Sequence, residues 1–350
     1  MQCNFVVATT LLLTLSACGG GGNANSSGSG NTSGSGSGTG STSSSACAIS
    51  SADPLIAVSL TGDIGNAQFQ NGGTQLVYSG GLSGTLNLVN DPTIPASCMD
   101  SNGSATSMHT AMQGGTGSIG ISHALVNGID KPVFLMKASA LAANTDLSSG
   151  AGNYVMLRYQ NDTLGGGQTR MSYVNFVIDN AGNWSMCKNA PTCTTPTATG
   201  TIQAKAGTTN QFEFVSAGLV RGVSFVLGSG TSRILVNAEH DTGDGLVSGI
   251  HFGFPQSPWN PALNSYTSNS TDQSVSTGTL AAGSIIVKTQ THFLMANNPI
   301  EGIATTTTSD GQINYLISSP SGLLVTGNNV SNNFDNGPGY FSFGITQASN

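Results

Sequence analysis

The densest group of ionisable residues in the chain is the run Glu-His-Asp-Thr-Gly-Asp at positions 239–244. Carboxylates are ligands for calcium, so Asp241 and Asp244 are candidate ligands, although their spacing is not that of an EF-hand loop. The alternative that we favour is a hairpin turn whose Asp side chains accept backbone N–H groups. His240 is expected on the apolar face of its strand, as a rim or core residue. We predict no cofactor.

The same run contains Asp241-Thr242-Gly243, which resembles the catalytic loop of aspartic proteases, where two carboxylates share a proton. The chain departs from that family because Asp244 follows where Ser or Thr is expected, and no second Asp-Thr-Gly or Asp-Ser-Gly occurs. No G-x-S-x-G nucleophile motif is present either. A Ser–His–Asp triad would have to assemble through folding, so we assign no catalytic residue.

A proline-stiffened loop offers the best candidate binding surface. It runs from Phe254 to Tyr266 as F-P-Q-S-P-W-N-P-A-L-N-S-Y, with Trp259 at its centre. A rigid, partly exposed tryptophan can stack on a sugar or anchor a protein partner. We therefore name Phe254, Trp259 and Tyr266 as candidate ligand-binding residues. The alternative, which we favour for Trp259, is a side chain that folds back and closes one end of the β-domain.

The N-terminus carries an export signal. An apolar run from Phe5 to Leu15 is too short to span a membrane and has the length of a signal-peptide core. It ends in Leu15-Ser16-Ala17-Cys18, which resembles the lipobox of bacterial lipoproteins. The resemblance implies a signal peptide over residues 1–17 and a lipidated Cys18, with Gly19 favouring the outer membrane. The alternative is cleavage that leaves a soluble exported protein.

Residues 18–46 are expected to form a flexible tether. After Cys18 the stretch consists almost entirely of Gly, Ser, Thr and Asn, without charge, so it cannot bury enough apolar surface to offset its ordering entropy. Its typical reach would be roughly 30 Å. Beyond it, residues 47–350 are expected to form a single β-rich domain.

Four cysteines remain after the signal peptide and the lipid anchor, namely Cys47, Cys98, Cys187 and Cys193. An even number in an oxidising compartment indicates disulfides, and four cysteines allow three pairings. We favour Cys187 with Cys193, across a short loop, and Cys47 with Cys98 by elimination. A zinc site is less favoured because the spacing is wide and no histidine lies nearby.

The composition argues against nucleic acid as a partner. Charged residues make up only 7% of the chain, against about 25% in typical soluble proteins. The formal net charge is −7 and no Lys/Arg cluster occurs, so nucleic acid is not an expected partner. Lipid attachment is expected to hold the chain at the membrane, with an envelope glycan or protein as its possible partner.

Alternation of apolar and polar residues predicts an all-β, antiparallel sandwich or barrel-like domain, with a propeller-like fold as the alternative. Strands are also expected over 232–241 and 246–254, which would form a hairpin. Their apolar faces coincide only if paired residue numbers have an even sum. A loop of Thr242-Gly243-Asp244, which pairs Asp241 with Gly245, satisfies this condition. Further strands are expected near 55–60, 75–79, 84–89, 132–138, 153–160, 171–178, 183–187, 200–205, 211–216, 221–227, 284–295, 300–307, 312–318, 322–326 and 341–346.

The lipobox, the Gly/Ser tether and the segment D-N-A-G-N-W-S-M-C-K-N-A-P-T-C at 179–193 together resemble uncharacterised lipoproteins of Gram-negative bacteria. The resemblance implies an envelope location, on the periplasmic or surface face, and a β-rich domain, but no catalytic residues. The expected function is a membrane-anchored binding or structural protein. The alternative is an envelope hydrolase acting on glycan or ester substrates, for which no catalytic pair is visible.

Overall fold

The structure, a computed structural model, describes most residues from position 47 onward. These are residues 47, 49, 52–92, 94, 97–101, 108–113, 117–162, 168–188, 190, 193–240, 247–259, 265–271, 275–281, 284–287, 291–297, 300–307, 311–329 and 339–346. The predicted signal peptide, the predicted lipidation site Cys18 and the tether up to residue 46 lie outside them.

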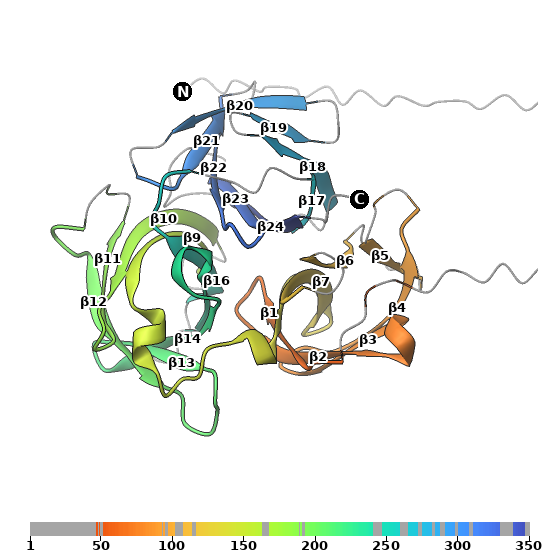
Figure 1. Ribbon diagram of the computed structural model, residues 1–350, viewed down its shortest axis with the longest axis horizontal. Coiled ribbons are helices and arrows are strands. Elements are labelled where there is room, and N and C mark those ends of the chain that lie inside the picture. Colours follow the sequence, from red (N-terminus) through yellow and green to blue (C-terminus); the bar gives the residue numbers. More distant parts are fainter. Residues whose placement is uncertain are drawn as a thin grey trace, which may run out of the picture. The chain divides into compact units, whose positions relative to one another are not determined.

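The described strands close into three antiparallel barrels of eight strands each, which follow one another along the chain (Figure 1). Within each barrel every strand pairs with its neighbours in sequence, and the last strand pairs with the first. Closure leaves no unpaired sheet edge among the strands that the structure describes. The prediction of an all-β, antiparallel sandwich or barrel-like fold is therefore confirmed in its barrel form, and the propeller alternative is wrong.

The strands have the following bounds. The first barrel consists of β1 Leu55–Ser59, β2 Ile64–Gln70, β3 Gln75–Gly80, β4 Thr85–Asn90, β5 Ser97–Asp100, β6 Thr110–Met112, β7 Ile119–Val126 and β8 Ile129–Lys137. The second consists of β9 Gly152–Asp162, β10 Gln168–Ile178, β11 Asn183–Lys188, β12 Ala198–Ala204, β13 Phe212–Ser216, β14 Leu219–Leu227, β15 Ile234–His240 and β16 Val247–Pro255. The third consists of β17 Ser265–Ser270, β18 Val275–Ala281, β19 Ser284–Val287, β20 Thr291–Asn297, β21 Ala304–Thr307, β22 Ile313–Ser318, β23 Leu323–Asn329 and β24 Gly339–Thr346. Short 3₁₀ turns are η1 Asn71–Gly73, η3 Ala138–Ala140, η4 Leu147–Gly150 and η5 Gly230–Ser232.

A common apolar core joins the three barrels on their outer faces. Phe134 of β8, Phe252 of β16 and Phe343 of β24 are completely buried there, although they come from three different barrels. Their ring centroids are 5.0 Å, 5.5 Å and 6.1 Å apart in pairs. Each phenylalanine belongs to the last strand of its barrel, so the three barrels present equivalent strands to one another.

An asparagine links the third barrel to the first. Asn269 of β17 is fully buried, and its side-chain Oδ1 accepts the backbone N–H of His109 at 3.1 Å. Its Nδ2 donates to the carbonyl oxygens of His109, at 2.9 Å, and Ser122, at 3.0 Å. These two residues belong to neighbouring parts of the first barrel, next to β6 and within β7. The Asn269 amide thus provides hydrogen-bond partners for backbone groups that are buried between the barrels.

The structure corrects two details of the strand assignment. The apolar faces of β15 and β16 coincide as expected, but the register differs by two residues, because His240 pairs with Ser248 and Leu235 with Gly253. The predicted pair of Asp241 and Gly245 itself lies outside the described residues. The single strand expected at 284–295 is two strands, β19 and β20, which pair with each other.

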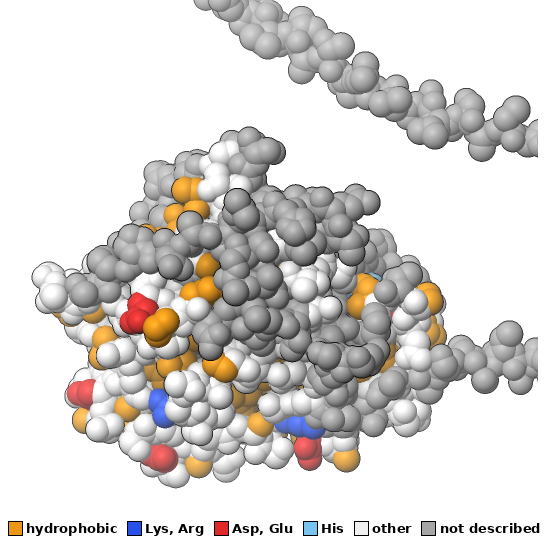
Figure 2. Space-filling view, turned by 45° about the horizontal axis from the view of Figure 1, so that its top comes forward, with side chains coloured by type: hydrophobic (Ala, Val, Ile, Leu, Met, Phe, Trp, Pro, Cys, Tyr) orange, Lys and Arg blue, Asp and Glu red, His pale blue; other side chains and the backbone are white. Residues whose placement is uncertain are grey.

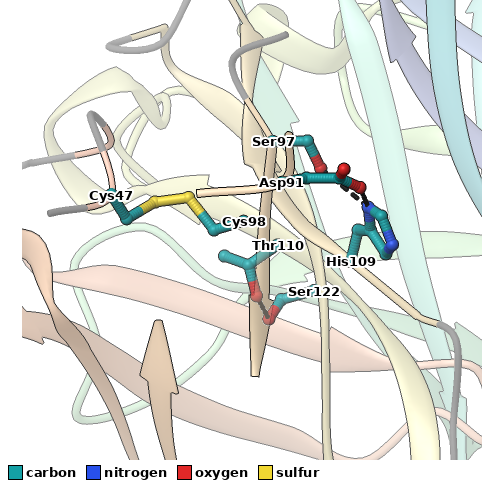
Figure 3. The surroundings of a disulfide bond; sticks show 7 residues. All are labelled: Cys47, Asp91, Ser97, Cys98, His109, Thr110 and Ser122. Carbon is teal, nitrogen blue, oxygen red and sulfur yellow. Dashed lines mark hydrogen bonds and ion pairs between the residues drawn. A yellow bond between two sulfur atoms is a disulfide. The ribbon is translucent and has the colours of Figure 1, made fainter. Parts of the chain in front are cut away.

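Two disulfides join Cys47 to Cys98 and Cys187 to Cys193, the pairing favoured from the sequence. The first bond holds the segment before β1 against β5, as Figure 3 shows. The second closes the short connection after β11.

The visible surface is poor in charge. In Figure 2, Lys, Arg, Asp and Glu side chains are sparse on the coloured face, and most of that face is uncharged. This agrees with a composition in which hydroxyl and amide side chains replace charged ones. In the described part of the chain, no helix has the length and apolar character needed to cross a bilayer.

Candidate functional site

The interior of the second barrel changes from apolar to polar along its axis. On β9 the inward-facing side chains are, in order, Tyr154, Met156, Arg158 and Gln160, because alternate residues of a strand point to the same side. Tyr154 and Met156 belong to an apolar cluster that is separate from the core between the barrels. The inward residues of β15 change in the same direction, from Leu235 through Asn237 to Glu239.

A cavity of about 310 Å³ lies where this change occurs. This volume is at the lower end of the range for sites that hold small molecules. Its walls combine apolar and aromatic side chains with a polar group that includes two arginines and one glutamate. The lining residues are Met156, Arg158, Phe176, Trp184, Met186, Ala198, Phe214, Ser216, Arg221, Asn237, Glu239, Val247 and His251.

Glu239 is the acceptor at the centre of the polar end. Its Oε2 accepts hydrogen bonds from Gln160 Nε2 at 2.6 Å and from His251 Nε2 at 2.9 Å. Its Oε1 lies 3.7 Å from Nη2 of Arg158. Burial opposes ionisation of Glu239, but the interactions with His251, Arg158 and Gln160 outweigh it and hold the pKa of this carboxyl below its usual range. The carboxylate is therefore ionised at neutral pH.

His251 is held as a neutral imidazole in a chain of hydrogen bonds. Ser224 donates to Oδ1 of Asn237 at 2.8 Å, and the Asn237 amide lies 3.1 Å from Nδ1 of His251. Nδ1 therefore accepts from this amide, which leaves the proton on Nε2, where it is donated to Glu239. Burial lowers the pKa of His251, against the opposing effect of Glu239.

The two arginines of the cavity reach it in different ways. Arg158 faces inward by strand alternation, and its Nη1 contacts the sulfur of Met186 at 3.4 Å. Arg221 lies at a β-bulge, because Phe214 pairs with Gly222 whereas Val215 pairs with Val220. A bulge re-aims a side chain, which accounts for the presence of Arg221 in the cavity wall.

Chemically, this arrangement can hold a small molecule that is apolar at one end and polar at the other. The aromatic and methionine side chains offer apolar contact, and the guanidinium groups offer hydrogen-bond donors in a fixed planar geometry. The inward glycine Gly249 does not belong to this function, because a Cβ there would lie 2.0 Å from the backbone oxygen of Tyr159 on the neighbouring strand. Close strand packing explains it.

A serine, a histidine and an aspartate also meet in the first barrel, close to the Cys47–Cys98 bond (Figure 3). Ser97 Oγ lies 3.0 Å from Nδ1 of His109, and Asp91 Oδ2 lies 3.1 Å from the same nitrogen. In a catalytic triad the aspartate contacts Nδ1 while the nucleophile contacts Nε2. Both partners here share Nδ1, and Ser97 is only 2% exposed, so the geometry does not activate the serine.

The structure brings together two of the three predicted binding residues. Phe254 and Trp259 line one cavity of about 310 Å³, together with Pro255 and Pro258. Tyr266 is buried and lines a different cavity, of about 150 Å³, in the third barrel. Trp259 is half-buried against the apolar cluster that contains Tyr266. This is the arrangement of the favoured alternative, a tryptophan folded back on the β-domain.

The predicted calcium ligands Asp241 and Asp244 lie outside the described residues. In the parts of the chain that the structure does describe, no group of three or more His, Cys, Asp or Glu side chains is placed to hold a metal ion. His240 lies at the end of β15, on the same face as Ile234, Val236 and Ala238, and is exposed there. This is the rim position of the prediction.

Sequence reasoning missed the cavity of the second barrel. The run at 239–244 contains Glu239, but Arg158, Trp184 and Arg221 were not singled out as site residues. One signal was present, since alternate residues of the predicted strand 153–160 change from Tyr and Met to Arg and Gln. The bulge that places Arg221 leaves no comparable signal.

No protein-family model and no curated protein sequence matches the chain. Among solved structures, it is similar to a mutant of the vaccine antigen Transferrin Binding Protein B from Haemophilus parasuis Hp5, with 8% sequence identity and a TM-score of 0.26. The match covers 83% of this chain and 67% of the other.

Proposed function

We propose that the chain is a lipid-anchored binding protein of the bacterial cell envelope, and that it holds a small ligand inside its second barrel. The observation that carries the proposal is the cavity of about 310 Å³ with an apolar wall and a charged wall. A core that served stability alone would be expected to fill such a space with apolar side chains.

The anchoring part of the proposal rests on the sequence. Leu15-Ser16-Ala17-Cys18 follows an apolar run and precedes the uncharged tether. Two or three acyl chains on Cys18 would hold the chain stably at a membrane. Gly19 supports the outer membrane as the destination, with the barrels on its periplasmic or surface face.

An envelope hydrolase has less support. The Ser97–His109–Asp91 group has both partners on one ring nitrogen. The Glu239 carboxylate already accepts hydrogen bonds from Gln160 and His251. A binding role needs no such activated group.

The cavity can be tested by filling it. Ala198 of β12 lines the cavity, whereas Ala204 on the same strand is exposed. The mature chain should copurify with a small molecule that native mass spectrometry detects as an added mass. Ala198→Trp should lose this mass, and Ala204→Trp should retain it. A bound mass that survives Ala198→Trp unchanged would place the ligand elsewhere, with the cavity of Phe254 and Trp259 as the next site to test.

A further inference from the structure

We infer that a second binding site lies between the second and third barrels, and that it takes a neutral pyranose sugar, such as one unit of a glycan. The site is the cavity of about 310 Å³ that Phe254 and Trp259 line. It is separate from the cavity inside the second barrel, so the inference stands apart from the ligand proposed there.

The walls of this cavity come from two barrels and are held in place by the backbone. Strands β9 and β16 of the second barrel and β22 of the third all contribute to the lining. The loop after β16 starts with a hydrogen bond from the N–H of Gln256 to the carbonyl oxygen of Asn153, at 2.8 Å. The loop then packs directly on the third barrel, where a Cβ at Gly302 would lie only 3.0 Å from the backbone oxygen of Ser257. A cavity that is preformed in this way costs a ligand little ordering of the protein.

Two buried polar atoms at the cavity are available to a ligand. Nε1 of Trp259 and Oγ of Ser318 are buried without a hydrogen-bond partner among the described residues, and both residues line the cavity. Ser318 follows Asn314 and Leu316 on the inward side of β22. It therefore lies at the end of the third barrel, where Trp259 packs against the apolar cluster. Buried N–H and O–H groups are normally hydrogen-bonded, so both atoms favour a bound molecule that carries hydrogen-bonding groups.

The rest of the lining is largely apolar and carries no charge. Val155, Phe254 and Pro320 are among the apolar residues, and none of the lining residues, all of which the structure describes, is charged. A molecule that fits has an apolar face, hydrogen-bonding groups and no charge. A pyranose has all three, because its ring faces carry C–H groups and its hydroxyls both donate and accept. A hydroxyl oxygen can accept from the indole N–H, which only donates, and can either donate to or accept from a serine.

Other occupants match this lining less well. A charged ligand would be buried without a charged partner, which is unfavourable. Water would pair with the two polar atoms but would leave the apolar wall without a partner. An extended peptide needs a longer groove than a cavity of this volume, which is at the lower end of the range for small-molecule sites.

The test titrates the mature chain labelled with 5-fluorotryptophan, which gives one fluorine NMR signal for each of its two tryptophans. The probes are the methyl pyranosides of glucose, galactose and mannose, with the uronide of each sugar as its anionic counterpart. At least one neutral pyranoside should shift the Trp259 signal saturably and leave the Trp184 signal in place. Its uronide should bind at least about tenfold more weakly, because the carboxylate would be buried without a partner.

Variants assign the binding to the two unpartnered atoms. Ser318→Ala removes the hydroxyl, and Trp259→Phe removes the indole N–H but keeps an aromatic ring. Each should lower the affinity for the bound pyranoside by about two- to tenfold. Saturation-transfer NMR of the sugar measures these affinities, because Trp259→Phe lacks the fluorine label. Ser265→Ala, at an exposed position of β17 outside the lining, should leave the affinity unchanged.

The same serine variant separates a binding role from a structural one. Without sugar, Ser318→Ala should not lower the temperature of half-unfolding, because its hydroxyl has no hydrogen-bond partner to lose among the described residues. A hydroxyl that served the fold alone would give the opposite result, a lower temperature of half-unfolding with unchanged sugar affinity.

Two further results would overturn the inference. If the uronides bind as tightly as the neutral sugars, an uncharged ligand is the wrong class. If no pyranoside shifts the Trp259 signal, the cavity is not a sugar site, whether a proline-rich peptide shifts that signal instead or nothing does. Neither result bears on the second barrel, whose ligand is followed through the Trp184 signal.

Discussion

Phe134 and Phe252 meet edge to face, with ring centroids 5.0 Å apart and ring planes at 88°, although each belongs to the last strand of a different barrel. Phe343 packs against both rings from the third barrel. Edge-to-face contacts contribute beyond the burial of the rings themselves. These three side chains therefore stabilise the association of the barrels, and not only the barrel to which each belongs.

Phe134→Ala should lower the free energy of unfolding by about 3–5 kcal/mol, because it removes a fully buried ring. Urea-induced unfolding followed by circular dichroism measures this loss. Ile129→Ala provides a control on the same strand, since Ile129 is 55% exposed and its truncation should have little effect. Equal losses of unfolding free energy for the two variants would contradict a common apolar core between the barrels.

Asn269→Ala should lower the free energy of unfolding by about 1–3 kcal/mol for each buried backbone group that it leaves without a hydrogen-bond partner. The reason is that the Asn269 amide forms hydrogen bonds with the backbone of both His109 and Ser122 in the first barrel. Amide hydrogen exchange should show faster exchange at His109, whose N–H loses its acceptor. Asn66→Ala, at an exposed position of β2, serves as the control. Unchanged protection of His109 would refute the role assigned to Asn269.

Stability should fall as the pH drops below about 6.5. Burial lowers the pKa of His251 in the folded chain, so the unfolded chain takes up this proton at a higher pH. The stability linked to His251 is therefore complete above the unfolded pKa of 6.5 and decreases as the pH falls toward the lower folded pKa. Each such proton contributes at most about 1.4 kcal/mol per pH unit.

His251→Gln should therefore flatten the dependence of unfolding free energy on pH between 7 and 5. Burial also lowers the pKa of His109, against the effect of Asp91, so a residual slope should remain. His240→Gln changes an exposed histidine and should retain the slope of the unaltered chain. A His251→Gln variant with that same slope would show that His251 is not held neutral.

Cells that express the full chain should incorporate labelled palmitate into it, because the lipobox resemblance predicts acyl chains on Cys18. Cys18→Ala should abolish the labelling and release the protein from the membrane fraction. Ser16→Ala, which keeps the lipobox pattern, should still be labelled. Label that persists in Cys18→Ala would refute the anchor.

The sequence patterns located many strands because alternation marks strands with one apolar face. They failed where both faces are buried, as in β7, which lies between the interior of its barrel and the core shared by the barrels. They also failed for β18, which is made largely of small and polar residues. Closure into three barrels was not predictable, because alternation defines the faces of a strand but not which strands meet at the end of a meander.

For the candidate site, the residue types were visible but their assembly was not. Glu239 and His251 meet Arg158 because β16 closes on β9, a pairing between strands that are far apart in the sequence. Trp259 was correctly placed by the alternative in which it folds back on the β-domain. Its proline-rich surroundings indicated a stiff loop without showing where the loop would pack.

The most direct test of the central claim uses the two tryptophans of the chain. Trp184 lines the cavity of the second barrel and Trp259 lines the other large cavity, so 5-fluorotryptophan labelling gives one fluorine NMR signal for each, assigned with Trp184→Phe. Titration with the copurified small molecule, after its removal from the chain, should shift the Trp184 signal saturably and leave the Trp259 signal in place. A shift of Trp259 alone, or no shift of either signal, would contradict a ligand site inside the second barrel.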